Sequence, residues 1–251
     1  MKYFVFSDAH GDYDALMKAV AEYGYEEGNA FHTLISCGDN FGRAETGKGS
    51  KGIYDYLTSS VHKNAPICLT GNHELILRKI LFRRSLSEID VLNGEDRTVY
   101  SFLGKNPETD TLSPYDLKKL GHGEVMDWLL NLPYYFETEN HLFLHGFLPF
   151  DTENLRFITE NLSDVGEEIW QKACWSKTPL MIMKFEHDYL GGLDKTVVFG
   201  HWHNAELRER FDKTVDEQNL HSIWRNDKLK LCGLDCCTVV SHRIEMLVVE
   251  A

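Results

Sequence analysis

Aspartate, asparagine and histidine residues recur in short blocks that lie far apart in this 251-residue sequence. Carboxylate and amide oxygens bind hard divalent cations, and imidazole nitrogens suit zinc, iron, manganese or nickel. A single block of this kind is more often a turn or a helix cap than a ligand site. Their repeated occurrence predicts a transition-metal centre, assembled from Asp8-x-His10, Gly38-Asp39, Gly71-Asn72-His73-Glu74, His145-Gly146 and Gly200-His201-x-His203.

A short apolar segment precedes each block and predicts a buried strand. These strands span residues 3–7, 33–37, 66–70, 141–144 and 196–199. Helices are predicted between the early strands, at residues 15–23 and 52–60, and this alternation indicates an α/β fold with parallel strand pairs. Loops at the carboxyl ends of such strands converge on one crevice, so the blocks are expected to meet there.

The remaining elements are predicted from shorter patterns. Residues 75–84 and 124–132 favour helices, and the polar stretch between them is expected to form a cap over the crevice. A further helical segment is predicted within residues 151–172. Short strands are predicted to finish the chain, at residues 222–224, 229–232, 237–241 and 244–249.

The composition is that of an ordinary folded protein, with 43% hydrophobic and 26% charged residues. The net charge of −13 argues against stable nucleic-acid binding, which depends on lysine and arginine. No stretch approaches the roughly 20 apolar residues of a membrane span, so no membrane association is expected. The six cysteines lack a dense paired framework, which favours reduced thiols in the cytoplasm. Cys232, Cys236 and Cys237 are expected to be buried rather than to bind metal.

The five blocks, in this order, closely resemble those of the calcineurin-like metallophosphoesterase superfamily. The resemblance covers nearly the whole chain, so a single domain over residues 1–251 is expected, with a partly helical, cap-like insert at about 75–135. It implies a four-layer α/β/β/α sandwich of two mixed sheets flanked by helices. Gly71-Asn72-His73-Glu74 and Asp8-Ala9-His10-Gly11 are most similar to the phosphoprotein phosphatase (serine/threonine phosphatase-like) branch and its bacterial relatives.

The resemblance also implies two divalent metal ions, manganese or iron in the first place, with zinc or nickel as alternatives. Asp39 would bridge the two ions, and a hydroxide between them would be the nucleophile. The full ligand set carried over by motif is Asp8, His10, Asp39 and His203 for the first ion, and Asn72, His145 and His201 for the second, together with Asp39.

Two further residues receive catalytic roles from the same resemblance. His73 would donate a proton to the leaving oxygen, and Arg43 would hold two phosphate oxygens; with Asn72 they form the expected substrate contacts. Two departures stand out. Gly42 occupies the place of the acid that usually orients the catalytic histidine, and His203 is typical of the wider superfamily rather than of the phosphoprotein phosphatase branch.

The implied activity is phosphoester hydrolysis, in the first place by a phosphomonoesterase of serine/threonine protein phosphatase type. Its substrate would be a phosphoprotein or a phosphorylated metabolite. A dinucleoside polyphosphate hydrolase or phosphodiesterase with the same site is one alternative. A non-catalytic binding scaffold is another, although the intact ligand series argues against it. Among the other histidines, His187 is the one expected to approach the site, from a loop.

Overall fold

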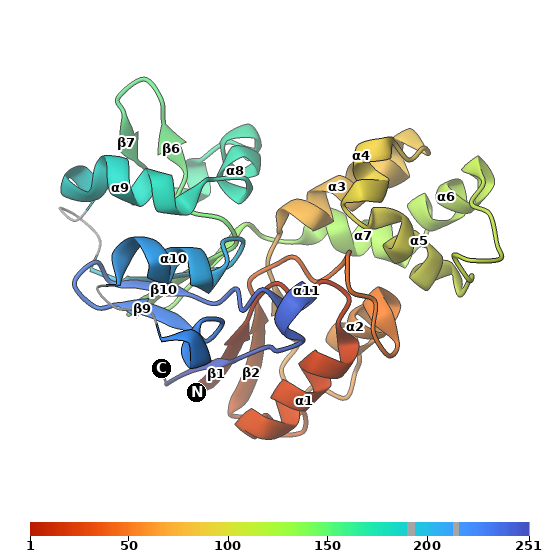
Figure 1. The fold of residues 1–251 in the computed structure, drawn as a ribbon, viewed down its shortest axis with the longest axis horizontal. Helices are drawn as coiled ribbons and strands as arrows, with labels where there is room; N and C mark the ends of the chain where they lie inside the picture. The colour runs from red at the N-terminus through yellow and green to blue at the C-terminus, as the bar shows by residue number, and fades with distance from the viewer. Residues whose placement is uncertain (190–193, 213–215, 251) are drawn as a thin grey trace.

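The computed structural model describes residues 1–189, 194–212 and 216–250, with the side chains of residues 179 and 185–189 left out. A first sheet of four strands has the order β11-β1-β2-β3. Figure 1 shows its central strands β1 and β2 side by side. The strands β1, β2 and β3 run parallel, and β11 pairs antiparallel with β1. Their bounds are β1 (Lys2–Phe6), β2 (His32–Ser36), β3 (Ile67–Cys68) and β11 (Leu247–Glu250).

A second sheet of five strands has the order β4-β5-β8-β10-β9. Its three inner strands run parallel, while β4 and β9 lie antiparallel at the two edges. The bounds are β4 (Tyr135–Glu137), β5 (His141–Leu144), β8 (Thr196–Phe199), β9 (Trp224–Asn226) and β10 (Leu231–Gly233). A separate pair is formed by β6 (Phe150–Asp151) and β7 (Arg156–Phe157).

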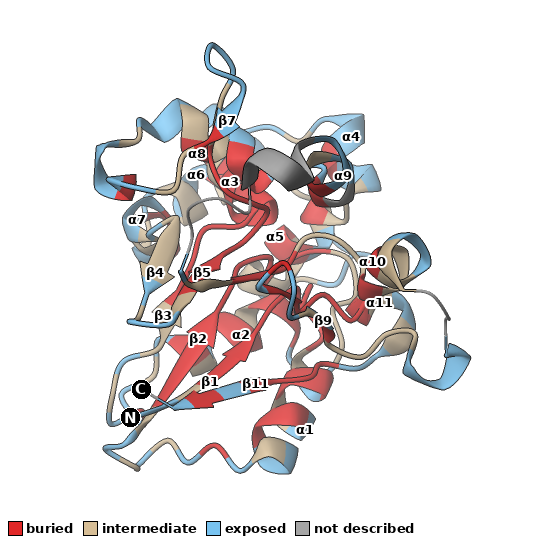
Figure 2. Cartoon of the chain, turned by 90° about the vertical axis from the view of Figure 1, so that its left-hand side faces the viewer, coloured by how far each residue is buried: buried red, intermediate tan, exposed pale blue. Residues whose placement is uncertain are grey.

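The two sheets pack face to face, which follows from alternating side chains along each strand. Val5 of β1 and Ile35 of β2 belong to one buried cluster with Phe143 of β5 and Val198 of β8. Their sequence neighbours point the other way, toward the helices on the outer faces. Strands buried on both faces have continuous apolar sequences, and Figure 2 shows most of β1 and β2 coloured as buried.

Helices cover both outer faces, so the predicted four-layer α/β/β/α sandwich is confirmed. Helices α1 (Tyr13–Tyr23) and α2 (Gly49–Leu57) pack on the first sheet. Helices α8 (Glu167–Cys174), α9 (Thr178–Tyr189) and α10 (Asn204–Phe211) pack on the second. Asp12 caps α1, because its carboxylate accepts a hydrogen bond from the amide of Ala15 at 3.0 Å.

Five helices between β3 and β4 gather on one side of the sheets (Figure 1). They have an apolar cluster of their own, which also takes in Phe41 and Tyr54 from the rest of the chain. This segment therefore packs against α2 and the loop that follows β2. The helices are α3 (Asn72–Arg83), α4 (Glu88–Leu92), α5 (Glu95–Leu103), α6 (Pro114–Gly121) and α7 (Glu124–Asn131).

Two of the predicted elements differ from those in the structure. Residues 237–241 form a helical turn, α11 (Thr238–Ser241), rather than a strand. The Asp235 carboxylate accepts a hydrogen bond from the amide of Cys237 at 2.7 Å, and Cys237 takes a left-handed φ of 54°, which turns the chain before the β-branched run can extend. Within residues 151–172, β6 and β7 pair and only α8 is an α-helix.

The cysteines are all free and buried. Cys232 lies between the two sheets, where burial raises the pKa of its thiol to about 12. It therefore behaves as the small apolar side chain that the sequence predicted. Within the described ranges, no helix combines the length and the apolar character that crossing a membrane requires.

Candidate active site

The polar blocks follow strands of both sheets and meet at one edge. Asp8 follows β1 and Asp39 follows β2, and the amide of His10 donates to the carbonyl of Asp39 at 3.0 Å. The amide of His201, after β8, donates to Oδ2 of Asp8 at 3.0 Å, so the second sheet is tied to the first. The five strand ends of the sequence prediction thus converge, as the parallel topology requires.

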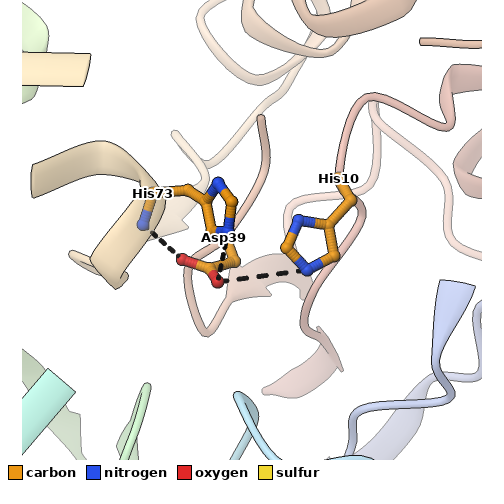
Figure 3. Close-up of side chains that lie close together, drawn as sticks. All are labelled: His10, Asp39 and His73. Carbon is orange, nitrogen blue, oxygen red and sulfur yellow. Dashed lines mark hydrogen bonds and ion pairs between the residues drawn. The ribbon is translucent and has the colours of Figure 1, made fainter. Parts of the chain in front are cut away.

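Asp39 lies at the centre of this arrangement. Its Oδ2 lies 4.0 Å from Nε2 of His10, and Figure 3 shows the two side chains facing each other. Its Oδ1 lies 3.3 Å from Nε2 of His145. Two donors that each lie about 2.0–2.2 Å from one ion are at most about 4.4 Å apart. The two carboxylate oxygens of Asp39 therefore face two different histidine donors at distances that a shared ion can span.

Backbone carbonyls fix the orientation of two of the histidines. Nδ1 of His145 donates to the carbonyl of Cys37 at 2.9 Å, and Nδ1 of His10 pairs with the carbonyl of Phe41 at 3.2 Å. The Nε2 atoms are left facing the centre, and Nε2 of His145 lies 2.9 Å from Oδ1 of Asn72. Carbonyl contacts of this kind usually hold metal-binding histidines in place.

Among the described residues, two sets of side chains could each hold a metal ion, and within each set the candidate ligand atoms all lie within 4.8 Å of one another. The sets are His10, Asp39 and His73, and Asp39, His145 and His201. Asp8 joins the first set through its Oδ1, which lies 3.7 Å from Nε2 of His10.

Uncompensated charge marks this cluster as a place for a cation. Burial, together with the charge of Asp235, raises the pKa of Asp8 well above its usual range. Burial also acts on Asp39, but neighbouring His145 and His73 outweigh it and lower its pKa. Oδ1 of Asp8 is buried and has no hydrogen-bond partner among the described residues. Buried charges are costly unless paired, and a bound cation would supply the missing partner.

Two histidines of the second set shift in opposite directions. Burial would lower the pKa of His145, but the carboxylate of Asp39 overrides it and raises the pKa to about 10. Burial and the neighbouring His145 lower the pKa of His201 to about 3. His201 is therefore neutral and free to donate a lone pair, which metal binding requires.

The backbone is strained at the same positions. Asp8, His10, Asp39 and His201 have left-handed φ values of 55°, 47°, 53° and 64°. Such conformations cost roughly 1–3 kcal/mol each for residues other than glycine, and they cluster at functional sites. The folded chain therefore holds four of the candidate ligands in conformations that local preference disfavours.

A cavity of about 210 Å³ opens beside this cluster. Arg43 and His73 line it with four of the candidate ligands, and so does His203, whose side chain is 40% exposed. The nearest carboxylate to His203 belongs to Asp235, whose Oδ2 lies 3.9 Å from Nε2. The remaining lining residues are Asn93, Trp175, Trp202, Glu206 and Asp235 itself. The structure thus places every residue of the sequence-predicted site at or beside one cavity, with His203 at its rim.

His73 is almost completely buried and contacts two carboxylates. Its Nδ1 lies 2.5 Å from Oε1 of Glu95, and its Nε2 lies 3.9 Å from Oδ2 of Asp39. Burial acts to lower the pKa of His73, but these two carboxylates outweigh it and the net shift is upward. His187, in contrast, lies in α9 rather than in a loop, and its side chain is outside the described part of the chain.

Sequence reasoning gave no role to Glu74, although it named the block that contains it, and missed Asp235 and Glu95 altogether. Glu74 accepts hydrogen bonds from the amides of Asp39 and Gly71, both at 2.9 Å, and so ties two of the loops together. Asp235 follows β10 as the other blocks follow their strands, so the same end-of-strand pattern could have found it. Glu95 begins α5 and carries no comparable signal in the sequence.

Comparison with known protein families identifies the family of this chain. A family model described as calcineurin-like phosphoesterase matches residues 1–227. No curated protein matches the chain.

Several solved structures share the fold. A protein serine/threonine phosphatase from Saccharomyces cerevisiae with similarity to human phosphatase PP5 is 15% identical, with a TM-score of 0.53, over 100% of this chain and 80% of that one. A cold-active protein-tyrosine phosphatase of a psychrophilic Shewanella species is 14% identical, with a TM-score of 0.55, over 99% and 75%. A protein provisionally assigned as a diadenosine tetraphosphatase is 16% identical, with a TM-score of 0.50, over 99% and 92%.

At identities of 14–16%, the solved structures support only the fold. The family model matches residues 1–227, which is most of the sequence, and so identifies the family. The chain belongs to the calcineurin-like phosphoesterase family and is a phosphoesterase hydrolase.

Proposed function

We propose that the protein is a dinuclear metal-dependent phosphomonoesterase of serine/threonine protein phosphatase type. The observation that carries the proposal is Asp39, whose Oδ1 and Oδ2 face His145 and His10 at 3.3 and 4.0 Å. A carboxylate in this position can bridge two ions. Family members typically depend on two metals, and the family resemblance favours manganese or iron, with zinc or nickel as alternatives.

Seven residues form the proposed ligand set. When bound, the two ions supply the positive charge that activates an attacking water and neutralises the phosphoryl oxygens. Oδ1 of Asp8, which has no hydrogen-bond partner among the described residues, and the neutral His201 are suited to bind a cation. The assignment is Asp8, His10, Asp39 and His203 for the first ion, and Asp39, Asn72, His145 and His201 for the second.

Two residues that line the cavity act on the substrate in this proposal. The guanidinium of Arg43 can hold two phosphate oxygens through paired N–H donors. Nδ1 of His73 is engaged by Glu95, and Nε2, which lies 3.9 Å from Oδ2 of Asp39, is the ring nitrogen left for the substrate. His73 donates the Nε2 proton to the leaving oxygen, a general-acid step worth about 10²–10⁴-fold.

The lining of the cavity favours a monoester over a dinucleoside polyphosphate. The carboxylates of Glu206 and Asp235 face the same space of about 210 Å³. A polyphosphate chain carries several negative charges, and like charges brought together cost several kcal/mol. Trp175 and Trp202 offer apolar surface for the leaving group. We therefore place phosphoproteins and phosphorylated metabolites ahead of nucleotides as substrates.

A substrate panel tests this preference. The manganese-loaded protein is expected to hydrolyse p-nitrophenyl phosphate with a kcat/KM about 10-fold or more above that for diadenosine tetraphosphate, because of the repulsion described above. Bis(p-nitrophenyl) phosphate, which carries a single negative charge, is included to detect phosphodiesterase activity. The measurement is the initial rate on each substrate with metal content determined in parallel. A higher rate on the tetraphosphate would favour the dinucleoside polyphosphate hydrolase, and metal-loaded protein inactive on all three would favour a binding scaffold.

Metal binding is also expected to stabilise the fold. Metal ions at 100 times their dissociation constant add about 2.7 kcal/mol of stability if only the folded state binds them. For a chain of this size that corresponds to an increase in Tm of roughly 5–10 °C. Differential scanning fluorimetry with manganese and with a chelator measures it. The same Tm with manganese and with the chelator would mean that the buried Asp8 and Asp39 do not bind a metal ion.

We also propose that residues 1–251 form one domain in which residues 75–135 are an insert beside the cavity. The six free, buried cysteines support a reducing compartment, and we place the protein in the cytoplasm.

A further inference from the structure

The loop that follows β2 lacks a side chain beside His73. Gly42 has a left-handed φ of 86°, and a Cβ atom built on it would lie 2.8 Å from Nδ1 of His73. This contact is closer than real Cβ atoms make. In the described structure, the loop therefore has no room for an acid at this position, and the partner of Nδ1 has to come from another segment.

Glu95 supplies that partner from the opposite side. Its Oε1 lies 2.5 Å from Nδ1 of His73, and the side chain is 0% exposed. Its other oxygen, Oε2, is buried without a hydrogen-bond partner in the described part of the chain. The buried carboxylate thus has one strong polar contact, and that contact is the imidazole ring. Burying a charged group that has a single partner costs desolvation free energy, so this pair lowers the stability of the fold unless its contact compensates.

The approach of Glu95 depends on the residue before it. Gly94 has a left-handed φ of 78°, and a Cβ atom there would meet the backbone nitrogen of Arg43 at 2.6 Å. Two glycines, one in each segment, therefore let the start of α5 lie against the loop that follows β2. A carboxylate in the first turn of a helix also faces the positive end of the helix dipole.

Helix α5 is itself held in place from α2. The amide of Lys51 donates to the hydroxyl of Ser101 at 3.1 Å, and the hydroxyls of Ser50 and Thr98 lie 3.4 Å apart. Val99 packs in the same apolar cluster as Phe41. Glu95 is therefore fixed by a rigid element, which is what a residue that orients another side chain needs.

We propose that Glu95 is the positioning residue for His73. It lies in the helical segment 75–135 and fills the role of the acid that is absent from the loop at Gly42. Its carboxylate accepts a hydrogen bond from Nδ1–H of His73 and so keeps Nε2 aimed at the leaving oxygen. The inference rests on the proposed function for its consequence in catalysis. The contact itself can be tested without turnover.

The activity test uses aryl phosphates whose leaving groups differ in pKa. Glu95→Ala is expected to lower kcat about 10–100-fold for phenyl phosphate and much less for p-nitrophenyl phosphate, since a good leaving group needs little protonation. KM and metal content stay near those of the parent protein. Glu95→Gln keeps an acceptor oxygen and is expected to retain more activity than Glu95→Ala. Glu88→Gln is the matched control, because Glu88 begins the neighbouring helix α4 but is exposed.

A second measurement addresses the contact directly. In ¹⁵N-labelled, metal-free protein, the Nδ1 proton of His73 is expected to give a far-downfield, slowly exchanging resonance that disappears in Glu95→Ala while the backbone spectrum shows a folded chain. Persistence of this resonance, or an equal loss of kcat for all leaving groups, would overturn the positioning role. Parent protein inactive on every phosphoester would count against the proposed function instead, and the resonance would still decide the role of Glu95.

Discussion

Asp39→Asn is expected to lose the dinuclear centre and to lower turnover of p-nitrophenyl phosphate by about 10³-fold or more, the scale on which electrostatic stabilisation of a transition state acts. The amide keeps the shape of the side chain but offers one oxygen in place of two. Because Oδ1 and Oδ2 face different histidine donors, the variant can serve one ion and not both. Elemental analysis of the purified variant, alongside the rates, measures both effects.

The matched control is Asp55→Asn. Asp55 is exposed in α2 and pairs with Lys51 on the surface, where an ion pair contributes little. This variant should keep parental metal content and rates. If Asp39→Asn retained two metal ions per chain and full activity, Asp39 could not be a bridging ligand, and the ligand assignment above would have to be replaced.

The strand ends of this site follow from the sequence because the signal there is local. Each of the five strands combines an apolar run with a polar residue immediately after it, and both parts are set by residues adjacent in the chain. In the structure, the ends of these strands differ from the predicted ends by no more than two residues, and β3 is shorter than predicted. Their convergence follows because parallel strands deliver their carboxyl ends to one edge.

The role of Glu95 could not be predicted in the same way. Its position depends on how helices α3 to α7 fold back, and on Gly42 and Gly94 allowing two segments to approach. These are long-range packing effects with no pattern in the neighbouring residues. The helical turn at residues 238–241 was missed for a related reason, since the hydrogen bond to Asp235 outweighs the strand preference of Thr238, Val239 and Val240.

Glu74→Ala is expected to be the most destabilising change at the site. The Glu74 carboxylate accepts hydrogen bonds from the amides of Asp39, Asn40 and Gly71 at 2.8–2.9 Å, all of them buried. Each donor left without an acceptor costs about 1–3 kcal/mol, so for three donors a loss of roughly 3–9 kcal/mol is expected. That is a large part of the 5–15 kcal/mol that a typical domain has in total.

Thermal or urea unfolding of metal-free protein measures this loss without interference from bound ions. Glu74→Gln retains one acceptor but turns an amide toward the same donors, so its stability should fall between those of Glu74→Ala and the parent. The control is Glu22→Ala, on the exposed face of α1, which should change stability by no more than about 0.5 kcal/mol. A parental unfolding midpoint for Glu74→Ala would show that the loops of β2 and β3 hold together without this carboxylate. The strained backbone at Asp39 would then need another source of support, because the amide of Asp39 is fixed through Glu74.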